Sequence, residues 1–174
     1  MQEKCRAFGN VGENHFMRCA VTGSKAVWAG FAQSATNAVF SRCVVGGSAA
    51  FNGFVRTSND GCRYSDCIVT GATARVGFVF TTNGANTFDD CRVACLYAYN
   101  TGTPESEENV FPYSGFAYRI GGGAVVNDCA AYGAISANRY NEDCGESAFV
   151  AFIKEGAVVS NCDGERDAVL NCGQ

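Results

Sequence analysis

Two segments rich in tyrosine and charged residues hold the side chains best suited to binding a ligand. They span residues 96–114 and 132–147 and read LYAYNTGTPESEENVFPYS and YGAISANRYNEDCGES. Aromatic faces with interleaved hydrogen-bonding groups suit a carbohydrate surface. The alternative is solvated loops with a few tyrosines packed against the scaffold. The candidate binding residues are Tyr97, Tyr99, Tyr113, Arg139, Tyr140 and Glu142.

Arg119, in the stretch GFAYRIGGG, is the candidate catalytic residue. If Phe116 points into a core, strand alternation places Ala117 and Arg119 outward. Tyr118 and Ile120 then point inward. The equivalent outward positions of the preceding repeats are Ser34, Thr57 and Thr81. Arginine binds carboxylates in bidentate fashion, so a single charge on this small polar row favours an anionic ligand. The alternative is an ordinary salt-bridged surface arginine.

Aspartates recur at one position of the chain's repeat. Asp66, Asp90 and Asp128 would stack like charges, which Ca²⁺, Arg42 or solvent could relieve. A metal ion here would use Asp89, Asp90 and Asp128 as its candidate ligands. Because the position suits a tight turn, we favour a structural role for these aspartates.

An internal repeat organises the chain around these residues. Cysteines recur at steps of 24, 24, 24, 38 and 33 residues, with an aromatic residue or valine three positions before each. A second ladder of Gly-Phe pairs, Ala-Phe at its last step, runs in phase 12 or 13 residues before the next cysteine. The repeated cysteines are Cys19, Cys43, Cys67, Cys91, Cys129 and Cys162.

The 24-residue period is typical of one coil of a parallel β-solenoid. The β-branched and aromatic bias favours strands, and no segment sustains a helical period. We therefore expect an all-β solenoid of about six coils that forms one domain over residues 1–174. Residues 1–13 would be a cap or partial coil. The two tyrosine-rich segments are insertions in the same loop of neighbouring coils, and loops of this kind often carry function.

The repeat also predicts corners and buried thiols. A core aromatic residue and a core cysteine three positions apart would face opposite sides of one strand, so a corner must lie between them. The residues there, such as Asp89-Asp90 and Ser160-Asn161, suit tight turns. We expect the cysteines to fill one narrow core slot as small hydrophobic side chains. Disulfides are the lesser alternative, and eleven cysteines leave at least one unpaired in a monomer.

Composition narrows the possible partners. A formal net charge of -4 argues against a general nucleic-acid binder and against a polybasic membrane anchor. No apolar run approaches the roughly 18 residues of a membrane helix. The first residues, MQEKCRAFGNVG, lack the apolar stretch of a signal peptide. The cytoplasm and a signal-free route to the exterior, such as a virion, both remain open.

The repeat resembles the right-handed, single-stranded parallel β-helix of the pectate lyase superfamily. GFAYRIGGGAVVNDCAAYG is similar to the GF-x-x-GG…NC-x-A-[FY]-x-N signature of family 9 polysaccharide lyases. KCRAFGN, residues 4–10, is similar to the C-x-A-F-G-N part of that signature. The resemblance covers most of the chain as a fold and about 30 residues as a motif.

The resemblance implies an activity and a place for it. Superfamily members cleave acidic, uronate-containing polysaccharides by β-elimination, with Lys or Arg as the base and usually Ca²⁺ to acidify the α-proton. Their cleft lies between the first parallel sheet and the loops after the third, which here are the Gly-Phe strands and the two insertions. Arg119 matches the basic position. The stretches RVGFVF and NGFVRT lack that family's calcium-binding aspartates.

Two other functions remain open. A noncatalytic glycan-binding module, such as part of a phage tailspike, would share the fold, and tailspikes leave the cell without signal peptides. That parallel favours an extracellular or virion-associated protein. A structural solenoid would instead pack its ends or flat faces against partners or further copies of itself.

Overall fold

The chain forms short parallel strands in three sheets. The computed structural model describes residues 8–23, 28–47, 52–71, 76–94, 115–132 and 149–164. Sheet A contains β1 (Phe8–Gly12), β4 (Ala32–Thr36), β7 (Val55–Ser58), β10 (Val79–Thr82), β13 (Ala117–Ile120) and β16 (Val150–Ile153). Sheet B contains β2 (His15–Met17), β5 (Val39–Ser41), β8 (Arg63–Ser65), β11 (Thr87–Asp89), β14 (Val125–Asn127) and β17 (Val158–Ser160). Sheet C contains β3 (Ala20–Thr22), β6 (Val44–Gly46), β9 (Ile68–Thr70), β12 (Arg92–Ala94), β15 (Ala130–Tyr132) and β18 (Asp163–Gly164).

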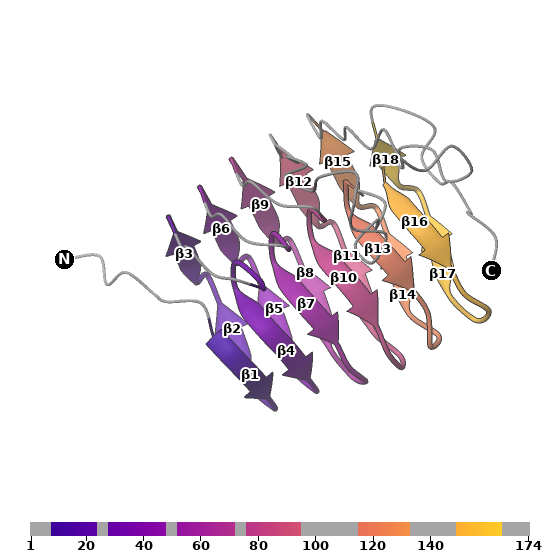
Figure 1. Ribbon diagram of the computed structural model, residues 1–174, viewed down its shortest axis with the longest axis horizontal. Coiled ribbons are helices and arrows are strands. Elements are labelled where there is room, and N and C mark those ends of the chain that lie inside the picture. Colours follow the sequence, from indigo (N-terminus) through magenta and orange to yellow (C-terminus); the bar gives the residue numbers. More distant parts are fainter. Residues whose placement is uncertain are drawn as a thin grey trace, which may run out of the picture.

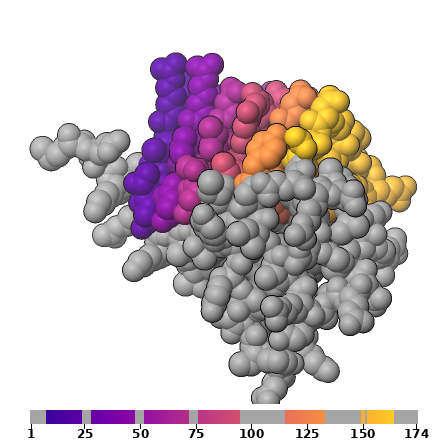
Figure 2. Space-filling model, turned by 90° about the horizontal axis from the view of Figure 1, so that it is seen from above, coloured from indigo at the N-terminus to yellow at the C-terminus, as the bar shows by residue number. Residues whose placement is uncertain are grey.

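Three consecutive strands supply one strand to each sheet, and this order repeats along the chain. Strands β1–β3 and β16–β18 therefore lie at opposite ends of the long axis (Figure 1). Figure 2 shows the same order as colour bands that run from indigo to yellow. The arrangement confirms the all-β class and the parallel stacking, and it is compatible with a β-helix. The described ranges contain no helix that could cross a membrane.

Two columns of aromatic rings fill the interior. The first follows the Gly-Phe ladder, where Phe54 and Phe78 stack with ring centroids 4.7 Å apart and planes 2° apart. The second lies on sheet B, where Tyr64 and Phe88 stack at 4.6 Å and 1°. The columns meet edge to face, as for Phe54 and Tyr64 at 6.0 Å and 85°. Both geometries are the favourable ones for aromatic pairs, each contributing about 0.5–1.5 kcal/mol beyond burial.

A buried polar network closes the turn between sheets A and B. The Ser58 hydroxyl lies 2.9 Å from the Tyr64 hydroxyl and donates to Asn86 Oδ1 at 3.0 Å. The Asn86 amide group donates to the carbonyl oxygens of Ser58, Asn83 and Gly84. Burial raises the pKa of Tyr64, which keeps its phenol protonated. The network satisfies polar groups that would otherwise destabilise the core.

The predicted cysteine slot is confirmed. Cys43, Cys67, Cys91 and Cys129 are buried, Cys19 and Cys162 are half-buried, and all six are free thiols. Their Sγ atoms donate to the carbonyl oxygen two residues earlier, as from Cys129 to Asn127 at 3.2 Å. The thiols thus satisfy backbone acceptors at the corner between sheets B and C.

The predicted corners are confirmed, and each has a left-handed residue at its second position. The φ values there lie between 48° and 54°. The corner residues with positive φ are Arg18, Arg42, Asp66, Asp90, Asp128 and Asn161. Asp and Asn adopt this conformation with little cost, whereas Arg18 and Arg42 do so against their intrinsic preference.

The predicted alternation along β13 is wrong at two positions. Ala117 packs in the main core with Phe116, and Tyr118 belongs to a separate apolar cluster. The physical reason is a kink, because the N–H groups of Phe116 and Ala117 both donate to the Phe149 carbonyl oxygen, each at 2.9 Å. The inward position of Ile120 is confirmed by its burial in the main core.

Close packing between strands accounts for the glycine of each Gly-Phe pair. A Cβ atom on Gly53 would overlap the carbonyl oxygen of Gly77, and one on Gly77 would overlap that of Gly115. The backbones of neighbouring repeats therefore approach too closely for any side chain at this position.

Replacing one of these glycines should destabilise the stack. We expect Gly77→Ala to lower the free energy of unfolding by about 3 kcal/mol, measured by chemical denaturation, because backbone must move. Gly46→Ala is the matched control, since its Cβ would meet only methyl groups of Thr22 and Thr70 at 3.8 and 3.9 Å. Equal losses in the two variants would contradict the explanation.

Relieving an unfavourable corner should stabilise the protein. Asn161 occupies the same corner position as Arg18, and asparagine tolerates positive φ. We expect Arg18→Asn to raise the free energy of unfolding by about 0.5–1 kcal/mol. Arg18→Ala keeps the strain and should bring no such gain; if it stabilises as much, the strain is not the cause.

Candidate functional site

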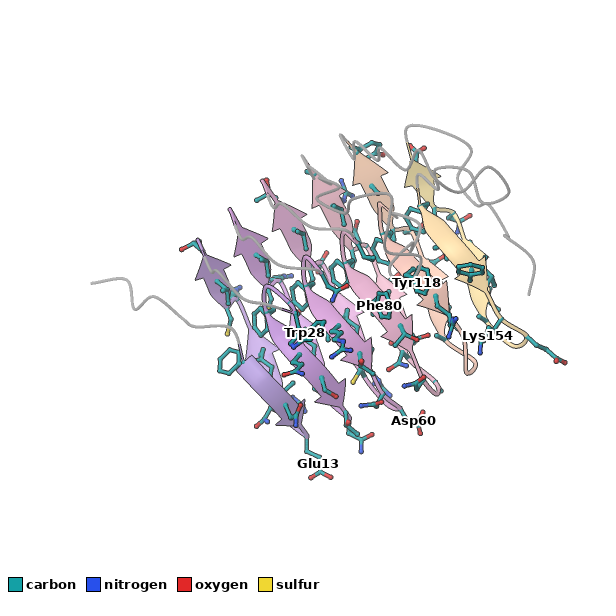
Figure 3. All side chains as sticks on the ribbon, viewed as in Figure 1. Glu13, Trp28, Asp60, Phe80, Tyr118 and Lys154 are labelled. Atoms are coloured by element: carbon teal, nitrogen blue, oxygen red, sulfur yellow. The ribbon has the colours of Figure 1, made fainter. Side chains whose placement is uncertain are left out.

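Aromatic and arginine side chains follow one another along the outer face of sheet A and beside its first strands. Trp28, Phe80 and Tyr118 run in a row along the long axis (Figure 3). In-register pairing places Arg119 beside Thr81 of β10 and Phe152 of β16. We call this row the sheet A strip, and its members are Trp28, Arg56, Phe80, Tyr118, Arg119 and Phe152.

One end of the strip is a cation–π pair. The Arg56 guanidinium carbon lies 4.1 Å from the centroid of the Trp28 ring. Trp28 is 41% exposed, so the pair is accessible to a ligand. A guanidinium over an indole face is attractive and is held with its remaining donors available. This pair can offer a flat apolar face and a positive charge together.

The backbone beneath this pair is held by a buried amide. Asn52 Nδ2 donates to the Trp28 carbonyl oxygen at 2.5 Å, and Asn52 pairs with Ala29 and Val76 as an isolated bridge. Asn52 Oδ1 is buried and has no hydrogen-bond partner. Its neighbours in that column are apolar, so the amide is satisfied on one side only.

The other end of the strip is an apolar cluster outside the main core. Phe80 and Tyr118 stack at 4.7 Å and 10°, and Tyr118 meets Phe152 edge to face at 5.1 Å. Val76 belongs to the same cluster. Tyr118 is only 8% exposed, so its ring supports its neighbours rather than forming an open platform.

Arg119 rests on this cluster. Its guanidinium carbon lies 5.6 Å from the Tyr118 ring centroid and 6.0 Å from that of Phe152. The predicted register with Ser34, Thr57 and Thr81 is confirmed. Within the described part of the chain, the ion pairs join Arg42 to Asp66 and Arg92 to Asp90, and Arg119 is in neither.

The predicted metal-binding aspartates lie elsewhere, at the corner between sheets B and C. Arg92 binds Asp90 through Nε at 3.1 Å and a terminal nitrogen at 2.7 Å, which lowers the pKa of the Asp90 carboxyl group. Asn127 Nδ2 donates to Asp89 Oδ1 at 3.3 Å and to Asp128 Oδ2 at 2.7 Å. Among the residues described, no three His, Cys, Asp or Glu side chains gather into a metal-binding group.

The six predicted binding residues of the two insertions lie outside the described residues, so their positions relative to the strip are not part of the site. These residues are Tyr97, Tyr99, Tyr113, Arg139, Tyr140 and Glu142. Nearly all of residues 96–114 and 132–147 falls in the same category, with Tyr132 as the exception at the end of β15.

Sequence reasoning missed most of the strip for one reason. Arg56, Phe80 and Tyr118 each stand two positions after a core phenylalanine, where regular alternation predicts an inward side chain. The kink at each Gly-Phe step turns this position outward instead. The available signal was a large or charged side chain at one fixed position of successive repeats.

Comparisons with protein-family models, with curated proteins and with solved structures found no match. The function must therefore be argued from the strip itself.

The Trp28–Arg56 pair can be tested by fluorescence, because Trp28 is the single tryptophan. We expect Arg56→Ala to uncover one ring face, shift the emission to longer wavelength and increase quenching by acrylamide. Arg63→Ala, which removes an exposed arginine from sheet B, is the control and should change neither quantity. Unchanged quenching in Arg56→Ala would show that the stacking does not persist in solution.

Proposed function

We propose that this protein binds an acidic polysaccharide along the outer face of sheet A, on a right-handed parallel β-helix of about six coils. The observation that carries the proposal is the combination of guanidinium groups and aromatic rings along the sheet A strip. Such a protein would act outside the cell or as part of a virion, where these polymers occur.

The chemistry of the strip suits a uronate polymer. Sugar rings present apolar C–H faces that stack on aromatic rings, and each uronate adds a carboxylate that a guanidinium binds in bidentate fashion. Trp28 with Arg56 supplies one such combination, and Arg119 over the Tyr118 cluster supplies another. An extended polymer lying across the strands would meet both.

A polar row accompanies these groups. Ser34, Thr57 and Thr81 precede Arg119 in register and are half-buried. Hydroxyl groups both donate and accept, so they can pair with sugar hydroxyls without adding charge. Arg119 is the charged member of this row in the described strands, which concentrates carboxylate recognition there.

A second candidate function is β-elimination, with Arg119 as the base. The observation that favours it is the position of Arg119 on the outer face of sheet A, held over two aromatic rings rather than in an ion pair of the described residues. A base must reach the proton α to the uronate carboxylate, and the same carboxylate would bring that proton to the strip.

Binding can be measured with polygalacturonate, using Trp28 fluorescence and calorimetry. We expect Arg56→Ala and Arg119→Ala each to weaken binding about tenfold, since each removes a charge-assisted hydrogen bond of roughly 1.5 kcal/mol. Arg63→Ala should remain within about twofold, because sheet B is not involved. Binding should also weaken as salt increases.

The matched ligand control is the same polymer with its carboxyl groups methyl-esterified. It keeps the sugar rings and removes the charges, so it should bind more weakly and lose the difference between wild type and the arginine variants. Equal affinity for both polymers, or no binding of several acidic polysaccharides, would contradict the proposal.

Turnover is tested separately by the ultraviolet absorbance of unsaturated uronate products, with and without added Ca²⁺. If the protein is a lyase, Arg119→Ala should abolish the signal, while Arg56→Ala should mainly raise KM. Binding without any absorbance change would favour the noncatalytic module and remove the β-elimination candidate.

A further inference from the structure

A line of in-register sulfur atoms runs through the interior, separate from the sheet A strip. We call it the thiol column, and its members are Cys19, Cys43, Cys67, Cys91, Cys129 and Cys162. The carbonyl oxygen of each accepts a hydrogen bond from the residue that follows the next column cysteine, at 2.8 to 3.0 Å. The two long steps in the sequence do not interrupt this pattern, since Cys91, Cys129 and Cys162 follow it too.

Neighbouring sulfurs of the column interact directly. The Cys91 N–H donates to Cys129 Sγ at 3.4 Å. Hydrogen bonds from the Cys43 and Cys91 thiols lower the pKa of Cys67, and burial raises the pKa of Cys91. Cys67 is therefore the sulfur from which a proton leaves most readily, and it lies between two further sulfurs.

We propose that the thiol column binds Cu(I) ions, each held between two successive sulfurs. Adjacent parallel strands lie about 4.8 Å apart, and two metal–sulfur bonds of about 2.3 Å in a line span nearly that distance. Sulfur ligands select soft ions such as Cu(I). The described residues form no group of three ligands, so the geometry suits linear two-donor sites and not a tetrahedral one.

Charge balance favours a monovalent ion in this apolar interior. Each Cu(I) replaces one thiol proton, forming one Cu–S bond as one S–H bond breaks, and the proton leaves to solvent. The second sulfur contributes a lone pair. The core charge is unchanged, so the large cost of burying a net charge is avoided. No electron is transferred, because the ion enters already reduced.

The ends of the column give access to it. Cys19 and Cys162 are half-buried, whereas the four thiols between them are at most 1% exposed. An ion can bind first at an end sulfur and then pass to the next, and strand openings at the ends of the stack cost less than openings at its centre.

The test uses a chain whose only cysteines are the six of the column. The replaced residues are Cys5, Cys62, Cys95, Cys144 and Cys172, each changed to alanine or serine. Cu(I) is supplied anaerobically with a competing chelator, and bound ions are counted by native mass spectrometry. We expect up to about five ions, one for each gap between neighbouring sulfurs, and sulfur-only coordination by X-ray absorption.

Two variants distinguish a column from scattered thiols. Cys67→Ala removes the sulfur shared by two gaps and should lower the number of ions by two, whereas Cys19→Ala removes an end and should lower it by one. Cys62→Ala in the wild-type chain is the matched control, because Cys62 is equally buried and lies off the column. Circular dichroism checks that each variant is folded; if Cys67→Ala does not fold, Cys19→Ala carries the comparison.

Proton release gives an independent readout. One proton should leave for each ion bound, so the affinity should rise about tenfold per pH unit. Absence of binding by the column-only chain, nitrogen or oxygen ligands, or an equal loss in Cys62→Ala would overturn the proposal.

Discussion

In-register pairing of parallel strands is the constraint on which every other feature of this protein depends. Each strand bonds the equivalent strand of the next repeat, so equivalent side chains stack directly on one another. A residue type that suits one layer must then suit its own copies above and below. Aromatic rings meet this condition by stacking face to face, and small thiols meet it by filling a narrow slot. Charged residues meet it only on the outside, where the Arg42–Asp66 and Arg92–Asp90 pairs lie.

The same constraint explains the backbone conformations that the protein uses. Three sheets around one core need a sharp change of direction after every few residues, and the left-handed residue at each B–C corner supplies it. Where sheet A begins, two successive N–H groups share one carbonyl oxygen, so both the phenylalanine and the next residue face the core. That kink brings neighbouring backbones so close that only glycine fits before Phe54 and Phe78. The conformational cost of these positions is offset by the continuous core they enclose.

Two chemically distinct arrays result, and they are separated by the sheet wall. The interior array is apolar and consists of rings and thiols, in which a neutral exchange of Cu(I) for a proton would leave the charge unchanged. The exterior array, the sheet A strip, combines guanidinium groups with rings and faces outward. Because the arrays occupy opposite sides of the fold, polysaccharide binding and ion binding would be independent, and a variant in one should leave the other intact.

Much of this architecture was decided by the sequence alone. The phase relation between the cysteine and Gly-Phe ladders determined the strand register, the corners and the buried thiols, because a repeat that pairs in register must present the same residue type at the same place. The register of Arg119 with Thr81 followed from the same relation. The tertiary structure alone decided the direction of Ala117 and Tyr118 and the existence of the sheet A strip. Regular alternation assumes one hydrogen bond per N–H along a ladder, and the kink at each Gly-Phe step, which depends on contacts between repeats, breaks that rule.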